Sequence, residues 1–270
     1  MLKALLVAVT TFLAVTIASA DRLADLSYGR HPAQVLDVYT PESAVKAPVI
    51  VMLHGGAWAF GDKRNRQVWR AKTDYWGPRG YVFVSVNTRL LPDADPIEQT
   101  QDLAGALAFI QRNAQRWGGD SERIVLMGHS AGAHVAALLA VRDDLRRAAG
   151  LQPWSGTILL DTAALDIALI MGRQPGRLYR NAFGSDPAFW SAASPIMHVS
   201  AREGPFLIVC SSKRRETCPV GRQFGRQGEV SGVATLVLPV ALRHGPINGE
   251  IGKSSAYTKS IDDWITRVLR

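Results

Sequence analysis

Short apolar runs alternate with amphipathic stretches along most of this chain. Runs that are apolar at nearly every position are typical of strands buried on both faces of a parallel sheet. The intervening stretches have helical spacing, as in 96–117, where Leu103, Leu107 and Ile110 fall on one face. The pattern predicts strands at 48–53, 81–87, 123–127, 157–161, 205–209 and 234–238, and helices at 64–76, 96–117, 131–141 and 255–269. With an antiparallel hairpin over 26–29 and 34–39, it predicts one α/β domain, a doubly wound and mostly parallel sheet flanked by helices.

The first twenty residues have a different pattern. Lys3 precedes an apolar run at 4–17, and Ala18-Ser19-Ala20 matches a signal-peptidase site. We therefore expect a signal peptide at 1–20, a mature domain at 21–270 without stable membrane insertion, and a periplasmic or secreted location. Lys and Arg number 31 against 23 Asp and Glu, but the excess is dispersed and no nucleic-acid motif accompanies it. Nucleic-acid binding is therefore not expected.

The strand at 123–127 runs into Gly128-His129-Ser130-Ala131-Gly132, a G-x-S-x-G motif followed at once by a helix of small residues. This is the context that a nucleophile elbow requires, because the serine must sit on a tight strand-to-helix turn. The motif makes Ser130 the expected nucleophile. The helix start also directs N–H groups toward the site, where an anion can be stabilised.

A second motif, His54-Gly55-Gly56-Ala57-Trp58, follows the strand at 48–53. Here the chain resembles α/β-hydrolases of the carboxylesterase and hormone-sensitive-lipase type, including feruloyl-esterase-like and kynurenine-formamidase-like members. The resemblance implies that Gly56 and Ala57, with Ala131, supply N–H groups to an oxyanion hole. It makes Trp58 either a wall of the substrate pocket or a core residue. It also implies that 164–200 is a lid insertion, although ordinary helix packing remains an equal alternative.

The order serine, acid, histidine in such enzymes places the base after the last strand. His244 lies there, in a Gly/Pro turn. The acid is expected after the strand at 205–209, where Glu216 is the only carboxylate in the loop. Cys210 and Cys218 flank this loop, and we expect them to form a disulfide that brings Glu216 to His244. Asp161, one strand earlier, is the alternative acid, and a dyad without an acid is the third possibility.

These features predict an exported serine hydrolase that cleaves small-molecule carboxylic esters through an acyl-enzyme intermediate. The histidines show no metal-ligand spacing, so neither a metal nor a cofactor is expected. Two alternatives remain: an arylformamidase-type amide hydrolase that uses the same residues, and a non-catalytic α/β-hydrolase scaffold with a binding role. Substrate identity and oligomeric state do not follow from the sequence.

Overall fold

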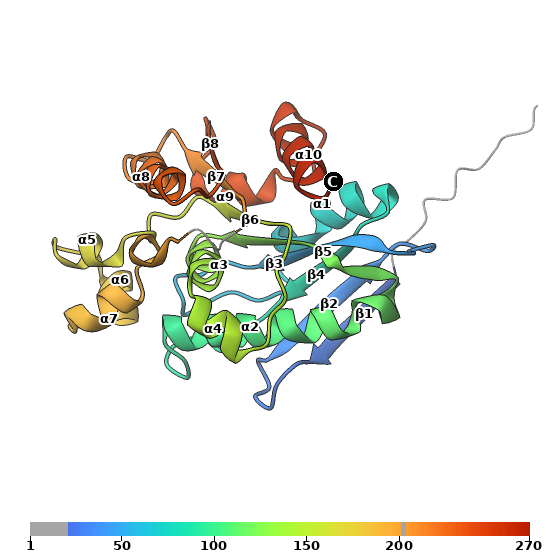
Figure 1. Ribbon diagram of the computed structural model, residues 1–270, viewed down its shortest axis with the longest axis horizontal. Helices are drawn as coiled ribbons and strands as arrows, with labels where there is room; N and C mark the ends of the chain where they lie inside the picture. Colours follow the sequence, from blue (N-terminus) through green and yellow to red (C-terminus); the bar gives the residue numbers. More distant parts are fainter. Residues whose placement is uncertain (1–20, 201–203) are drawn as a thin grey trace, which may run out of the picture.

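The computed structural model describes residues 21–200 and 204–270, so the predicted signal peptide lies outside the described residues. Over these residues the chain forms an eight-stranded sheet in the order β1-β2-β4-β3-β5-β6-β7-β8 (Figure 1). β1 and β2 pair antiparallel, as do β2 and β4, and the remaining pairs are parallel. The strands are β1 (Asp21–Ser27), β2 (Val35–Thr40), β3 (Ala47–Leu53), β4 (Val82–Val86), β5 (Gly119–His129), β6 (Gly156–Leu160), β7 (Phe206–Ser211) and β8 (Thr235–Val240).

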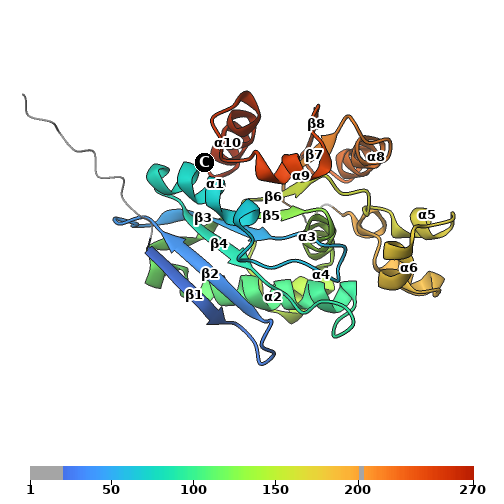
Figure 2. The same ribbon diagram turned by 180° about the vertical axis from the view of Figure 1, so that it is seen from behind.

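Helices cover both faces of the sheet, as the alternation of patterns predicts (Figure 2). One face packs against α1, α9 and α10, and the other against α2, α3 and α8. The helices are α1 (Arg66–Trp76), α2 (Pro96–Asn113), α3 (Ala131–Val141), α4 (Asp143–Ala148), α5 (Ile167–Met171), α6 (Arg177–Phe183), α7 (Pro187–Ala192), α8 (Thr217–Val230), α9 (His244–Gly249) and α10 (Ala256–Val268). Three 3₁₀ segments complete the list: Gly77–Arg79, Ala114–Trp117 and Pro195–His198.

The central strands are buried on both faces, which explains their continuous apolar sequences. Every residue of β4, β6 and β7 is buried. Parallel pairing sets Leu53 opposite Gly128, and His129 opposite Leu160. The carboxyl ends of β3, β5 and β6 therefore meet at one edge of the sheet, where ligands bind in open α/β sheets.

The segment expected to form a lid, 164–200, contains α5, α6, α7 and the last 3₁₀ helix. These short helices form a cluster beside the sheet, at the end where β6 and β7 terminate (Figure 1). Phe183 and Ala193 anchor the cluster because both side chains are fully buried in the core shared with α2 and α3. Throughout the described ranges no helix has the length and hydropathy needed to cross a membrane.

Candidate active site

Ser130 occupies the turn between β5 and α3 with φ 56° and ψ −119°. A non-glycine residue rarely adopts positive φ, and this strain is characteristic of functional turns. The Ser130 N–H is held by the Leu160 carbonyl at 2.9 Å. The turn therefore presents Ser130 at the sheet edge in a single conformation.

The two glycines of the motif are required by close backbone packing. A Cβ at Gly128 would lie 2.3 Å from the Gly132 carbonyl oxygen, and a Cβ at Gly132 would lie 2.2 Å from the His54 carbonyl oxygen. Neither contact can be relieved without moving backbone. The G-x-S-x-G spacing thus follows from the approach of the His54 loop to the first turn of α3.

His244 is the first residue of α9, and its Nε2 lies 2.9 Å from Ser130 Oγ. The ring packs against His129 in a tilted arrangement with a centroid distance of 4.6 Å, and His129 Nε2 lies 3.1 Å from the His244 carbonyl oxygen. Burial, with the neighbouring His244 ring, lowers the pKa of His129 to about 3. His129 is therefore neutral near pH 7, and its Nε2–H donates to that carbonyl and supports the ring of His244.

The carboxylate that contacts His244 is Asp161, at the end of β6. Its Oδ2 lies 2.7 Å from His244 Nδ1, and its Oδ1 accepts the Ser211 N–H at 2.9 Å. Asp161 is 1% exposed. Burial alone would raise its pKa, but hydrogen bonds from His244, the Ser211 N–H and Arg214 outweigh burial and hold the pKa below its ordinary value. Asp161 is therefore ionised and accepts the Nδ1–H of His244.

The expectation that Glu216 contacts His244 is wrong. Glu216 is exposed at the start of α8 and makes no side-chain capping bond there. Cys210 and Cys218 do form the expected disulfide, which ties the last turn of β7 to the first turn of α8. This bridge does not turn Glu216 toward the site, because the intervening loop directs Arg214 there.

Arg214 Nη1 donates to Asp161 Oδ2 at 2.8 Å and lies 2.8 Å from His244 Nδ1. Arg214 and the protonated Nδ1 are both donors, so Asp161 Oδ2 accepts from both. The loop that carries Arg214 is short and closed by the disulfide. The guanidinium of Arg214 thus lies beside Asp161 and the His244 ring, in the loop where the sequence predicts a carboxylate.

The loop of Gly56, Ala57 and Trp58 has positive φ at all three residues, 136°, 51° and 61°. The N–H groups of Gly56 and Ala57 donate to no other group among the described residues. Gly55 lies against Ser130, since a Cβ there would be 3.0 Å from the Ser130 Cβ. The N–H of Ala131, the first residue of α3, likewise has no partner within the helix, so the three N–H groups predicted for the oxyanion hole are available to a ligand.

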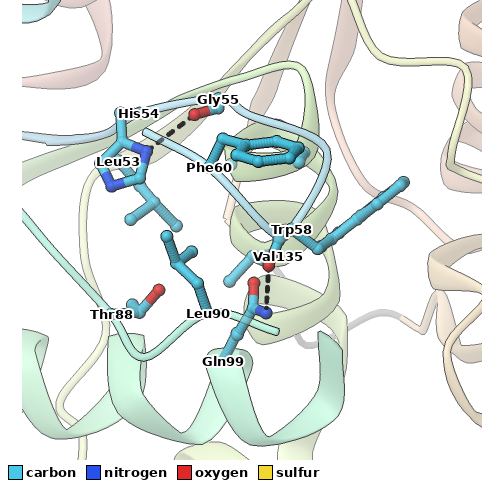
Figure 3. A pocket seen from close by; sticks show the side chains of 11 residues that line it. Leu53, His54, Gly55, Trp58, Phe60, Thr88, Leu90, Gln99 and Val135 are labelled. Carbon is cyan, nitrogen blue, oxygen red and sulfur yellow. Dashed lines mark hydrogen bonds between the residues drawn. The ribbon is translucent and has the colours of Figure 1, made fainter. Parts of the chain in front are cut away.

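Trp58 belongs to the core and does not line the pocket that contains Ser130, so its interpretation as a pocket wall is wrong. It is 5% exposed, and its ring packs against Phe183 at 4.8 Å. Its Nε1–H donates to His134 Nδ1 at 3.1 Å. Figure 3 shows the second contact, in which Gln99 Nε2 donates to the Trp58 carbonyl. Trp58 borders a small cavity of about 10 Å³ behind the loop, enough space for about one water.

His134 connects three parts of the site. Because its Nδ1 accepts from Trp58, its Nε2 carries the proton and donates to the Ala193 carbonyl at 2.8 Å. Burial lowers the pKa of His134 to about 4, which favours this neutral form. His134 therefore joins the loop at 54–58, helix α3 and the end of the α5–α7 cluster. The sequence analysis assigned no role to Arg214, His129 or His134. The position of His129 directly before Ser130 was a signal that could have placed it in the site.

An open pocket of about 460 Å³ contains Ser130 and His244. Its other walls come from the 54–62 loop, from Asn65 and Gln67, from Leu178 of α6 and from Asn248 of α9. Pockets of this size accommodate small organic ligands.

The chain is similar to known esterases in sequence. The BD-FAE family model matches residues 36–217. The chain is 28% identical to Esterase LipQ of Mycobacterium tuberculosis over 72% of its own length and 49% of that protein. It is 32% identical to the probable isoprenylcysteine alpha-carbonyl methylesterase ICME of Oryza sativa subsp. japonica, over 52% of this chain and 33% of that protein. The chain thus spans half or less of the length of these curated relatives.

Solved structures share the fold. A truncated carbohydrate esterase from gut microbiota superposes with a TM-score of 0.79 at 18% identity, covering 93% of this chain and 97% of that one. Esterase 2 of Thermogutta terrifontis gives 0.71 at 22% identity, covering 93% and 92%. The sheet and these likenesses confirm the predicted α/β-hydrolase fold.

Proposed function

The chain belongs to the BD-FAE family, and from this premise we propose that it is a serine hydrolase that cleaves carboxylic esters of small molecules. The observation that carries the proposal is the continuous chain of contacts from Ser130 through His244 to Asp161. The esterase names of its relatives favour ester hydrolysis over other acyl transfers.

Each residue has a role in the proposed reaction. Ser130 Oγ attacks the acyl carbonyl while His244 Nε2 accepts the hydroxyl proton, and Asp161 stabilises the resulting imidazolium. The N–H groups of Gly56, Ala57 and Ala131 bind the oxyanion of the tetrahedral intermediate. One such donor typically contributes about 3–4 kcal/mol to transition-state stabilisation.

His244 then protonates the leaving alcohol as the ester C–O bond breaks, which leaves an acyl group on Ser130. Water, deprotonated by the same nitrogen, attacks the acyl carbon. The carboxylic acid departs when Ser130 regains its proton, and the enzyme returns to its starting state. The proposed reaction sequence requires no cofactor.

The position of Asp161 also bears on the scaffold alternative. A non-catalytic scaffold needs no carboxylate to orient His244. Asp161 supplies a buried carboxylate to His244, which favours the catalytic proposal over the scaffold alternative. We further propose that the protein acts outside the cytoplasm, because the leader pattern at 1–20 and the Cys210–Cys218 disulfide are both typical of exported proteins.

The test is hydrolysis of 4-nitrophenyl acetate and butyrate by the mature protein beside Ser130→Ala. We expect turnover that falls at least about 10⁴-fold in the variant. Equal rates for the two proteins would contradict the proposal. Parallel assays with a 4-nitroanilide of the same acyl group measure amide cleavage, which the ester proposal expects to be far slower.

A further inference from the structure

A groove of about 860 Å³ lies beside the active site, between α8 and the helices α5 and α6. Both ribbon views place α8 next to this helix cluster (Figures 1 and 2). The lining of the groove includes the half-buried side chains of Ile170, Tyr179 and Val220. It therefore has room and surface for the carbon skeleton of a substrate.

Arginines also line this groove. Arg173, Arg215 and Arg226 line the groove, are exposed, and pair with no carboxylate in the described part of the chain. The groove contains two acids, Asp166 and Glu216. Asp166 is engaged at the start of α5, where its Oδ1 accepts the Leu169 N–H at 2.9 Å. The three unpaired guanidinium groups therefore exceed the acidic charge of the groove.

The groove adjoins the proposed catalytic residues at Arg214. This residue lines the groove and also contacts Asp161 and His244 at 2.8 Å. The two pockets adjoin again at α6, where Leu178 faces the pocket of Ser130 and the next residue, Tyr179, faces the groove. The groove therefore lies next to the pocket that contains Ser130.

We propose that this groove binds a carboxylate that the ester substrate carries away from its scissile bond. The inference rests on the proposed esterase activity and specifies its substrate class. Guanidinium groups stay charged at all working pH values and bind carboxylates in a bidentate manner. An excess of cations in a recess also attracts anionic substrates, and this attraction weakens as salt increases.

The substrates for the test are 4-nitrophenyl half-esters of glutaric, adipic and suberic acid, each compared with the same compound capped as a methyl ester. The series measures how long an acyl chain must be for its free carboxylate to reach the groove. A second pair, 4-acetoxybenzoate and 4-acetoxybenzamide, places the charge on the alcohol part instead. The ratio of kcat/KM between charged and neutral partners is the measured quantity.

The test variant replaces the three unpaired arginines with glutamine: Arg173→Gln, Arg215→Gln and Arg226→Gln. Exposed ion pairs are individually weak, so we expect the charged-to-neutral ratio to fall about tenfold for at least one substrate pair. We expect 0.5 M salt to reduce the wild-type ratio in the same direction.

The control variant removes the same charge elsewhere, at three exposed arginines that do not line the groove: Arg112→Gln, Arg222→Gln and Arg267→Gln. We expect this control to retain the wild-type ratio. A ratio that is unchanged in the test variant, or that falls equally in the control, would overturn the inference.

Failure of this inference is distinguishable from failure of the proposed function. If the parent hydrolyses the neutral esters but its charged-to-neutral ratio does not respond to the groove arginines, only the groove assignment is wrong. If the parent hydrolyses none of the esters, the esterase proposal itself fails. Circular dichroism and turnover of neutral 4-nitrophenyl butyrate verify that each variant is folded.

Discussion

Replacing Asp161 with asparagine exchanges one carboxylate oxygen for an NH₂ group at a side chain whose two oxygens are both hydrogen-bonded. The Ser211 N–H already donates to Oδ1, so the oxygen of the new amide stays there and its NH₂ group takes the place of Oδ2. That group then faces His244 Nδ1 and the Arg214 guanidinium, which are both donors in the native arrangement. His244 can relieve the clash only by moving its proton to Nε2.

The cost of this change follows from the role of Nε2. With a proton on Nε2, His244 cannot accept the proton of Ser130, although the ring stays in place. A comparable substitution of a triad aspartate in a serine protease lowers kcat about 10⁴-fold. This corresponds to roughly 5 kcal/mol of activation free energy. We expect a loss of this size for Asp161→Asn, with KM nearly unchanged because the carboxylate is remote from bound substrate.

The assay is steady-state hydrolysis of 4-nitrophenyl butyrate, with Glu216→Gln as the matched control. Glu216 is exposed and does not contact His244 in the described structure, so its variant should keep wild-type kcat. A drop confined to Glu216→Gln would refute the reasoning and restore the loop after β7 as the source of the acid. A loss of less than tenfold in Asp161→Asn would also refute it.

Three further outcomes are expected. Gly132→Ala should destabilise the protein and lower activity, because its Cβ would lie 2.2 Å from the His54 carbonyl oxygen. Gly105→Ala in α2 should instead stabilise by about 0.5–1 kcal/mol, because a Cβ there would make ordinary contact with the Tyr28 ring at 3.8 Å. Equal melting temperatures for the two variants would be inconsistent with this packing. Replacing Cys210 and Cys218 with serine should lower the free energy of unfolding in urea by roughly 2–3 kcal/mol, and no change would argue against the loop-closure reasoning. Burial lowers the pKa of His134 from 6.5 to about 4. As pH falls from 6.5 toward 4, this histidine is therefore protonated in the unfolded chain but not in the folded protein, and the free energy of unfolding decreases. Over this pH range the free energy of unfolding of His134→Gln should fall less steeply than that of the wild type, by up to about 1.4 kcal/mol per pH unit. Parallel plots of unfolding free energy against pH for the two proteins would contradict the assignment of a lowered pKa to His134.

Local patterns were sufficient to predict the sheet and the strand-to-helix turn that carries Ser130. The continuous apolar runs predicted the parallel strands, because strands covered on both faces tolerate few polar side chains. The glycines of the two motifs predicted the turns at Ser130 and Gly56, because close backbone approach excludes side chains there. His244 followed from the order of strands and the position of its turn.

The acid was not predictable in the same way. Asp161 and Glu216 both follow parallel strands, and the choice depends on how far each loop extends over the sheet edge. The loop after β7 is occupied by Arg214, and Thr217 already begins α8. How far a loop extends over the sheet edge depends on the folded structure, and it leaves no local pattern in the sequence.

Helix α8 was missed because its composition opposes helix formation. Gly221, Gly225 and Gly228 lie within it, and glycine is among the weakest helix formers. They allow close packing, since a Cβ at Gly221 would lie 3.0 Å from Ile208 and one at Gly228 would lie 2.9 Å from Thr235. Tertiary packing on β7 and β8 therefore overrides local propensity.

The central claim is that Ser130 is an activated nucleophile, and fluorophosphonate labelling tests it most directly. The mature protein, Ser130→Ala and Asp161→Asn are treated with the reagent, digested, and analysed by mass spectrometry. The account predicts rapid modification of the peptide that contains Ser130, slow modification in Asp161→Asn and none at this peptide in Ser130→Ala. An unlabelled native protein, or label on a different residue, would contradict it.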